Sequence, residues 1–286
     1  MSGQEFDLEA YYASYPARII ERPGYPARAA FKSGLMWRLY GRELRRRLGD
    51  VTTYADIGGA FGFAANALAF HMAKGQSRPP QTVIFEIVPA FVAMGQQLFP
   101  TCHFVQSKFE DWTGEPRLFD LISLFDLLEH LVDPETLLRA AAARGRYLLL
   151  KTPMETTAPW LGSRPLAQGG AAHPDGHIQF FSPKPYEAML DRCGLEILKT
   201  RLMPTVVPIG ARLALIPERL GEPVPEGMAR IKRHLRAVAR TVHLGMPACL
   251  FRFARAIIGG GTHLSLCRSR LVDPDASGAS ATAATP

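Results

Sequence analysis

The sequence has few cysteines and no long apolar run. Its four cysteines show no spacing typical of a metal site or of a disulfide-rich secreted domain, and they lie far apart at Cys102, Cys193, Cys249 and Cys267. We therefore predict buried free thiols and no bound metal. Arg, Gly or Pro interrupts each apolar segment well before the roughly 18 residues that a membrane-spanning helix needs, so we expect no transmembrane segment.

A signal-peptide pattern is also lacking. The N-terminal stretch "MSGQEFDLEAYY" is acidic and has neither the basic start nor the apolar core of a secretory signal. We therefore predict a cytoplasmic protein. With 286 residues, 47% hydrophobic and 21% charged, the chain has the size and composition of one large globular domain with an appendage.

Excess positive charge is missing from most of the chain. Residues 1–200 carry 21 basic and 21 acidic side chains, whereas residues 201–258 carry ten basic and three acidic ones. Apolar residues recur at three- and four-residue steps in "EGMARIKRHLRAVARTVHL" (226–244), which predicts a helix with one apolar stripe and a basic remainder. This basic segment is either a solvated helical face or a surface that meets an anionic partner.

Strand-like and helix-like segments alternate through the rest of the sequence. Short apolar runs separated by helical patterns indicate a parallel sheet that is covered on both faces. Asp133 and Pro134 are typical of an N-cap and a first helical position. The predicted strands are 53–58, 82–87, 103–106, 118–126, 146–152, 195–203 and 259–269, and the predicted helices are 62–72, 89–98, one from 134, and 183–193.

The stretch "YADIGGAFG" predicts a ligand-binding turn at the carboxyl end of the first strand, where open α/β sheets bind ligands. Glycine there permits a tight backbone and leaves room for a ligand, and a helix that opens at Gly62 offers free N–H groups. A dinucleotide fingerprint counted from Gly58 fails at Phe63, and counted from Gly59 it fails at Phe61. The small residues instead fall at Gly58, Ala60 and Gly62, after Asp56.

This spacing resembles the first motif of the class I S-adenosylmethionine-dependent methyltransferases, of the small-molecule type, with Ala60 in place of the middle glycine. The resemblance covers about residues 53–202 and the seventh strand. It includes Glu86 in "VIFEIVP", a fourth motif in "FDLISLFDLLEHLVDPETLL", a fifth in "YLLLKTP", and the segment "GHIQFFSPKPYEAMLDRCGLEIL".

The resemblance implies a Rossmann-like seven-stranded sheet, mostly parallel with the last strand antiparallel, and helices on both faces. We expect the domains to be an N-terminal helical segment at 1–50 and a methyltransferase core at 51–202 plus 259–272. Residues 203–258 would form a basic helical insert between the last two strands, acting as a cap or lid, and 273–286 a disordered tail.

The resemblance also implies S-adenosylmethionine as the cofactor. Glu86 would accept the ribose hydroxyls, and Asp126 would lie beside the sulfonium. Ser107 occupies the place where many relatives have an acid for the adenine amino group, and Phe109 packs either on the adenine or in the core. The predicted cofactor-binding residues are Asp56, Gly58, Ala60, Gly62, Glu86, Ser107, Phe109 and Asp126.

Methyl transfer to an alcohol generally needs a base with a pKa near neutrality, and histidine fits this need. Three histidines are candidates. His177 comes first because a loop position can approach a substrate directly, His173 lies in the same loop, and His130 follows the fourth strand. For each of them, a purely structural role is the alternative.

We therefore predict a methyltransferase that modifies a small molecule or glycan, most simply at oxygen. The alternatives are a non-catalytic cofactor-binding or scaffold protein, a nicotinamide-dependent oxidoreductase, and a methyltransferase acting on a lipid-linked substrate at a membrane surface. In the last case, segment 203–258 would face an anionic or lipid-linked substrate, and the protein would be peripheral to the inner membrane surface. Nucleic acid is not expected, because the charge is confined to one segment and no RNA-binding motif is present.

Overall fold

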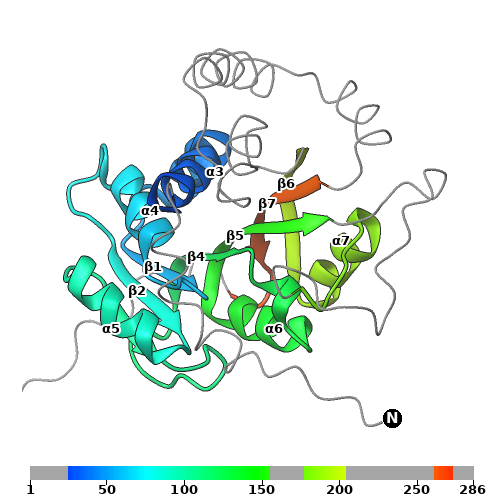
Figure 1. The fold of residues 1–286 in the computed structure, drawn as a ribbon. Helices are drawn as coiled ribbons and strands as arrows, with labels where there is room; N and C mark the ends of the chain where they lie inside the picture. Colours follow the sequence, from blue (N-terminus) through cyan, green and yellow to red (C-terminus); the bar gives the residue numbers. More distant parts are fainter. Residues whose placement is uncertain (1–24, 155–176, 204–260, 273–286) are drawn as a thin grey trace, which may run out of the picture. The chain divides into compact units, whose positions relative to one another are not determined.

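The described residues form a seven-stranded sheet with helices packed against it (Figure 1). The computed structural model describes residues 25–154, 177–203 and 261–272. The strand order is β3-β2-β1-β4-β5-β7-β6. The strands are β1 (Thr53–Ile57), β2 (Gln81–Glu86), β3 (His103–Gln106), β4 (Phe119–Phe125), β5 (Gly145–Met154), β6 (Leu195–Met203) and β7 (Gly261–Ser269).

The pairing of the central strands is parallel. β1 lies between β2 and β4, with Asp56 opposite both Ile84 and Ser123, and the parallel ladder continues to β3 on one side and β5 on the other. The sheet continues from β5 through β7 to the edge strand β6, and it contains one antiparallel pair. The predicted fold class is therefore confirmed.

Helices cover both faces of the sheet. They are α3 (Tyr25–Leu48), α4 (Phe63–Ala73), α5 (Pro89–Leu98), α6 (Pro134–Arg144) and α7 (Pro183–Arg192). The connections that contain α4 and α5 lead from β1 to β2 and from β2 to β3, toward one edge of the sheet. The connection that contains α6 leads from β4 to β5, toward the other edge. Since such crossovers are right-handed, α4 and α5 lie on one face and α6 on the other. α3 packs along α4, and α6 contacts α7.

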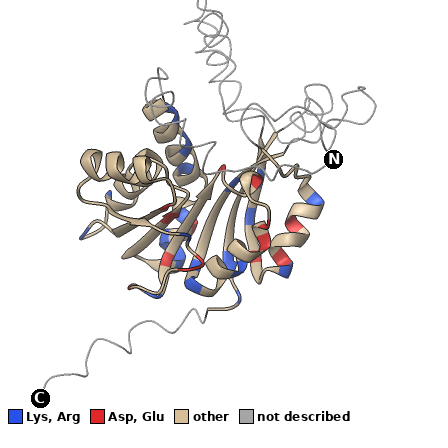
Figure 2. Ribbon diagram, turned by 60° about the horizontal axis from the view of Figure 1, so that its bottom comes forward, with Lys and Arg blue, Asp and Glu red and all other residues tan. Residues whose placement is uncertain are grey.

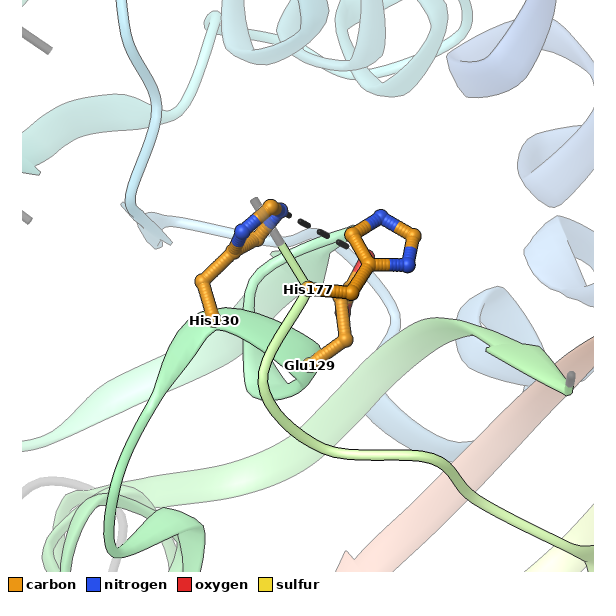
Figure 3. Close-up of side chains that lie close together, drawn as sticks. All are labelled: Glu129, His130 and His177. Carbon is orange, nitrogen blue, oxygen red and sulfur yellow. Dashed lines mark ion pairs between the residues drawn. The ribbon is translucent and has the colours of Figure 1, made fainter. Parts of the chain in front are cut away.

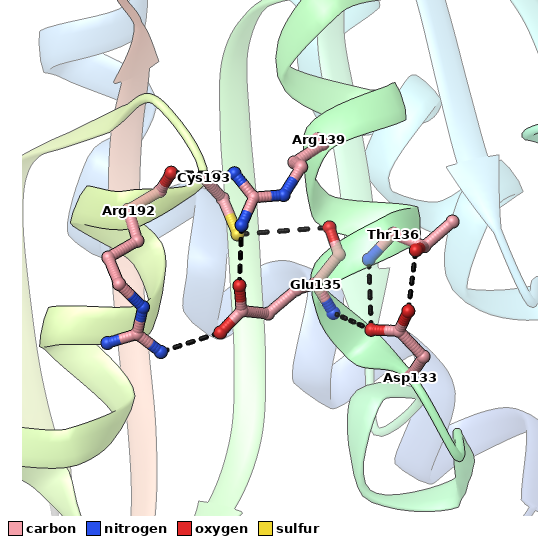
Figure 4. Close-up of polar contacts among 6 residues, drawn as sticks. All are labelled: Asp133, Glu135, Thr136, Arg139, Arg192 and Cys193. Carbon is pink, nitrogen blue, oxygen red and sulfur yellow. Dashed lines mark hydrogen bonds and ion pairs between the residues drawn. The ribbon is translucent and has the colours of Figure 1, made fainter.

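A polar network joins α6 to α7 (Figure 4). Asp133 caps α6 as predicted, accepting hydrogen bonds from the backbone N–H groups of Glu135 and Thr136 at 3.1 and 3.2 Å. The Glu135 carboxylate pairs with Arg139 one helical turn later and with Arg192 at the end of α7, both at 2.6 Å. The network therefore links the first turns of α6 to the C-terminal end of α7.

Charges of both signs are interspersed over the described helices and strands (Figure 2). Cys102, Cys193 and Cys267 are buried free thiols, as predicted. In the described residues no helix has both the length and the apolar character needed to cross a membrane. Cys249, residues 1–24 of the N-terminal segment, the basic insert after Met203 and the predicted disordered tail lie outside the described residues.

Contacts divide the chain into two compact units. One consists of residues 1–152, 171–201 and 263–286, and the other of 153–170 and 202–262. Every residue of the site described below belongs to the first unit. The domain boundaries drawn from the sequence remain predictions.

Candidate active site

The turn between β1 and α4 has an unusual backbone. Gly58, Ala60 and Gly62 all have positive φ angles, of 68°, 47° and 84°. Glycine adopts this left-handed region without penalty, whereas alanine at such an angle is strained by its Cβ. The small residues at Gly58, Ala60 and Gly62 therefore correspond to alternating left-handed backbone positions, and the backbone is strained at Ala60.

Relief of this strain gives a testable expectation. Ala60→Gly should raise the free energy of unfolding by up to about 1 kcal/mol, because the left-handed penalty of roughly 1–2 kcal/mol exceeds the extra chain entropy of glycine. The same change at Ala67, a helical residue of α4, should instead cost about 1 kcal/mol. Urea unfolding of both variants measures the difference, and an equal loss in both would show that Ala60 is not strained.

The glycines of this turn allow close packing against the protein itself. A Cβ added at Gly58 would lie 2.7 Å from the Leu127 side chain, and one at Gly62 would lie 2.8 Å from Phe104. At Gly59 it would lie 2.5 Å from Ile84. These glycines are therefore needed to seat the turn against the sheet, a reason that the sequence analysis, which invoked room for a ligand, did not anticipate.

Glu86, at the end of β2, holds the turn from the side. One carboxylate oxygen accepts a hydrogen bond from the backbone N–H of Ala60 at 2.9 Å. The other accepts hydrogen bonds from the N–H groups of Ile87 and Val88 at 2.8 and 2.9 Å. Burial raises the pKa of Glu86, and these three N–H groups oppose the rise. Since a carboxylate offers about four acceptor positions, one position remains for a ligand.

Asp56 is buried beneath the turn and 2% exposed. Its carboxylate accepts a hydrogen bond from Ser123 of β4, whose hydroxyl also bonds to that of Tyr54 at 2.6 Å. Burial raises the pKa of Asp56 to about 7, although the two hydroxyls oppose the rise. Asp56 therefore supports the turn from within the protein.

Ser107 and Phe109 follow β3. The Ser107 hydroxyl donates to the carbonyl of Lys108 at 2.8 Å and retains its acceptor capacity. Phe109 is 1% exposed, packs edge-on against Phe85 with ring centroids 4.9 Å apart, and has the Arg144 guanidinium 5.5 Å from its ring centroid. These contacts favour the core alternative for Phe109.

Asp126 stands where β4 ends. Its φ of 53° is left-handed, and its carboxylate forms ion pairs with Lys32 of α3 and Lys151 of β5. Burial alone would raise the pKa of Asp126, but the two ammonium groups hold it below its usual range. The N-terminal helix therefore contributes a charged side chain to the carboxyl edge of the sheet.

Three further side chains gather one turn beyond Asp126 (Figure 3). Glu129 and His130 lie in the short helix η1 (Leu128–His130), and His177 lies in the segment before α7. The two imidazole centroids are 4.9 Å apart, and Nε2 of His130 lies 3.9 Å from Oε1 of Glu129. Burial, followed by the charge of Asp126, raises the pKa of Glu129 to about 8.

The structure thus brings together two of the three predicted catalytic histidines. His173 lies outside the described residues. Lys32, Lys151 and Ser123 were not predicted from the sequence, and Glu129 was not among the predicted site residues. One signal was available for Lys151: a lysine within the apolar run "YLLLKT" predicts a buried charge, and such a charge needs a partner. Lys32, on an ordinary helix, gave no comparable signal.

Comparisons with known proteins bear on the family and the fold of this chain. A family model described as a methyltransferase domain matches residues 34–200. A protein from Galdieria sulphuraria assigned as a sarcosine dimethylglycine methyltransferase has a TM-score of 0.55 at 18% identity, with 81% of this chain and 83% of that chain covered. The [4+2]-cyclase SpnF has a TM-score of 0.50 at 15% identity, with 82% and 81% covered.

At these identities the solved structures show the fold alone. A search of curated proteins found no match. The family model covers more than half of the chain, and the fold agrees with it. The chain therefore belongs to the methyltransferase-domain family and is an S-adenosylmethionine-dependent methyltransferase.

Proposed function

We propose that this enzyme methylates an oxygen atom of a small-molecule or glycan acceptor. The observation that carries the proposal is the pair of imidazoles, His130 and His177, at the carboxyl end of β4. Imidazole is the side chain best suited to accept a hydroxyl proton near neutral pH. An amine acceptor, once neutral, already has a free lone pair and has less need of such a group.

The residues around the turn suit the cofactor. Bound S-adenosylmethionine supplies an electrophilic methyl group on a sulfonium. We propose that the backbone from Gly58 to Gly62 lies against the cofactor. The remaining acceptor position of Glu86 would accept a hydrogen bond from a ribose hydroxyl, and the Ser107 hydroxyl would accept one from the adenine amino group. Asp56 would hold the turn in shape from beneath, and Asp126 would face the amino-acid end of the cofactor.

The role of Glu86 can be tested by calorimetric titration. Glu86→Ala should weaken S-adenosylmethionine binding about 10- to 100-fold, since a hydrogen bond to a charged group contributes about 1.5–3 kcal/mol. Glu115→Ala is a matched control, because Glu115 is an exposed carboxylate paired with Arg117. If both variants bind like the wild type, Glu86 does not hold the ribose.

Selection of the acceptor is proposed to involve segment 203–258. The ten basic and three acidic side chains of residues 201–258 suit an anionic or lipid-linked acceptor. Attachment to an anionic membrane surface is part of the same proposal. Binding to vesicles with and without anionic lipid checks it, with loss of binding at high salt as the expected result.

The reaction is tested by following a labelled methyl group. The full chain is incubated with S-adenosylmethionine carrying a ¹³C-methyl group and a panel of hydroxyl, amine and carbon acceptors, and products are read by NMR. The methyl chemical shift distinguishes attachment to oxygen, nitrogen or carbon. Transfer to oxygen supports the proposal, and transfer to nitrogen or carbon alone overturns it.

A further inference from the structure

The buried carboxyl group of Glu129 has an unusual environment. Its side chain is 1% exposed, and neither carboxylate oxygen has a hydrogen-bond partner among the described residues. Buried polar groups almost always have partners, so such an exception needs an explanation.

Two imidazoles lie beside this carboxyl group. One ligand atom from each of Glu129, His130 and His177 can be chosen so that all three lie within 4.8 Å of one another. We propose that these three side chains bind a divalent first-row transition-metal ion of the Zn²⁺ type. The sequence analysis expected no metal, because it considered cysteine spacing and did not bring His177 beside Glu129.

The separations are close to those of a bound site. With metal–ligand bonds of about 2.0–2.2 Å, the ligand atoms of a tetrahedral site lie about 3.4 Å apart. Oε1 of Glu129 and Nε2 of His130 are already 3.9 Å apart, and the two rings meet edge to face at 85°. Side-chain rotations, including one that turns a nitrogen of the His177 ring toward the other two groups, would therefore complete the geometry (Figure 3).

The backbone holds the three ligands in place. The carbonyl oxygen of Glu129 accepts the N–H groups of Ile178 and Gln179 at 2.8 and 2.9 Å. These two bonds fix the residues directly after His177 to the helical turn that carries the other two ligands. The site therefore joins η1 to the segment before α7, and backbone hydrogen bonds hold these two parts together.

The donor set favours a transition metal over Mg²⁺. Two imidazoles and one carboxylate are ligands typical of Zn²⁺ and its neighbours, whereas Mg²⁺ prefers oxygen ligands only. Asp126 is not counted as a ligand, because Lys32 and Lys151 both pair with it. Those two ammonium groups oppose a nearby cation, so the Glu129 charge is needed to balance them.

Three protein ligands leave at least one coordination position open. If the proposed oxygen methylation is correct, this position would take the acceptor hydroxyl. The ion would lower the pKa of that hydroxyl so that its proton is released to water, and the imidazoles would then serve as ligands and not as proton acceptors. This role rests on the proposed function. The binding of the ion does not, since it requires neither cofactor nor acceptor.

The experiment titrates the chelator-treated full chain with Zn²⁺ by calorimetry and with Co²⁺ by visible absorption, without cofactor or acceptor. The site variants are His177→Ala and Glu129→Gln, and the control is His103→Ala, which removes an exposed histidine of β3. We expect one equivalent bound by the wild type and the control. Both site variants should bind at least about 100-fold more weakly, since even losing a neighbour of a metal ligand costs about 10- to 100-fold.

Circular dichroism first establishes which variants are folded, and a Glu129→Gln protein that fails to fold leaves His177→Ala to decide. Absence of binding by the wild type overturns the proposal, as does unchanged affinity in any folded site variant. Because binding is measured without turnover, a negative result leaves oxygen methylation standing. Conversely, metal binding by the wild type would still support the metal site if the methyl group were found on nitrogen or carbon.

Discussion

Asp126→Asn is expected to lower the free energy of unfolding by about 3 kcal/mol or more. The change leaves the Lys151 ammonium group, whose side chain is 6% exposed, without its counter-charge, and removing one partner of a buried ion pair typically costs about 3–5 kcal/mol. Asparagine tolerates the left-handed backbone at this position, so the effect reports on charge and not on strain. Urea unfolding at neutral pH measures it.

The double variant Asp126→Asn/Lys151→Met is the control. It removes both charges and keeps the approximate side-chain volumes, so we expect it to be more stable than Asp126→Asn alone. A double-mutant cycle with both single variants gives the coupling energy. If the losses of unfolding free energy in the two single variants simply add, Asp126 and Lys151 do not stabilise each other.

The same pair predicts a pH dependence. The pKa of Asp126 is lowered in the fold, so its stabilising contribution is complete above the unfolded carboxyl pKa of about 3.9 and is lost as the pH falls through the lower folded value. Asp126→Asn should therefore lose less stability than the wild type on acidification below about pH 4. Parallel acid-unfolding curves would contradict this expectation.

His177→Ala is expected to lower kcat by about 100-fold or more. A positioned proton acceptor contributes about 10²- to 10⁴-fold, and a metal site that loses one of three ligands would lose activity to a similar or greater degree. Affinity for S-adenosylmethionine should stay within about twofold, because His177 lies beside η1 and not at the turn after β1. Steady-state rates with an acceptor from the panel, together with cofactor titration, measure both quantities.

His103→Ala serves again as the matched control, since it removes an exposed imidazole from β3. We expect wild-type kcat for this variant. A His177→Ala enzyme with normal kcat would exclude His177 from both proposed roles. If instead its only defect were weaker cofactor binding, His177 would belong to the cofactor site.

Much of the fold could be predicted from local sequence. Pro89 begins α5 and Leu98 ends it, β6 runs from Leu195 to Met203, and Asp133 caps α6, all as predicted. Such features are readable because apolar periodicity, helix caps and proline positions depend on neighbouring residues only. The turn after β1 was readable for the same reason, since its left-handed residues favour glycine at fixed spacing.

Side-chain partnerships could not be read in this way. Lys32 meets Asp126 across 94 positions of the chain, and His177 meets His130 only because backbone bonds to Glu129 hold the segment before α7 against η1. The sequence by itself determined the order of elements and the position of the left-handed turn after β1. The tertiary structure alone decided which charges are paired, which carboxyl group is buried without a partner and which histidines meet, because strand order and helix packing set those distances.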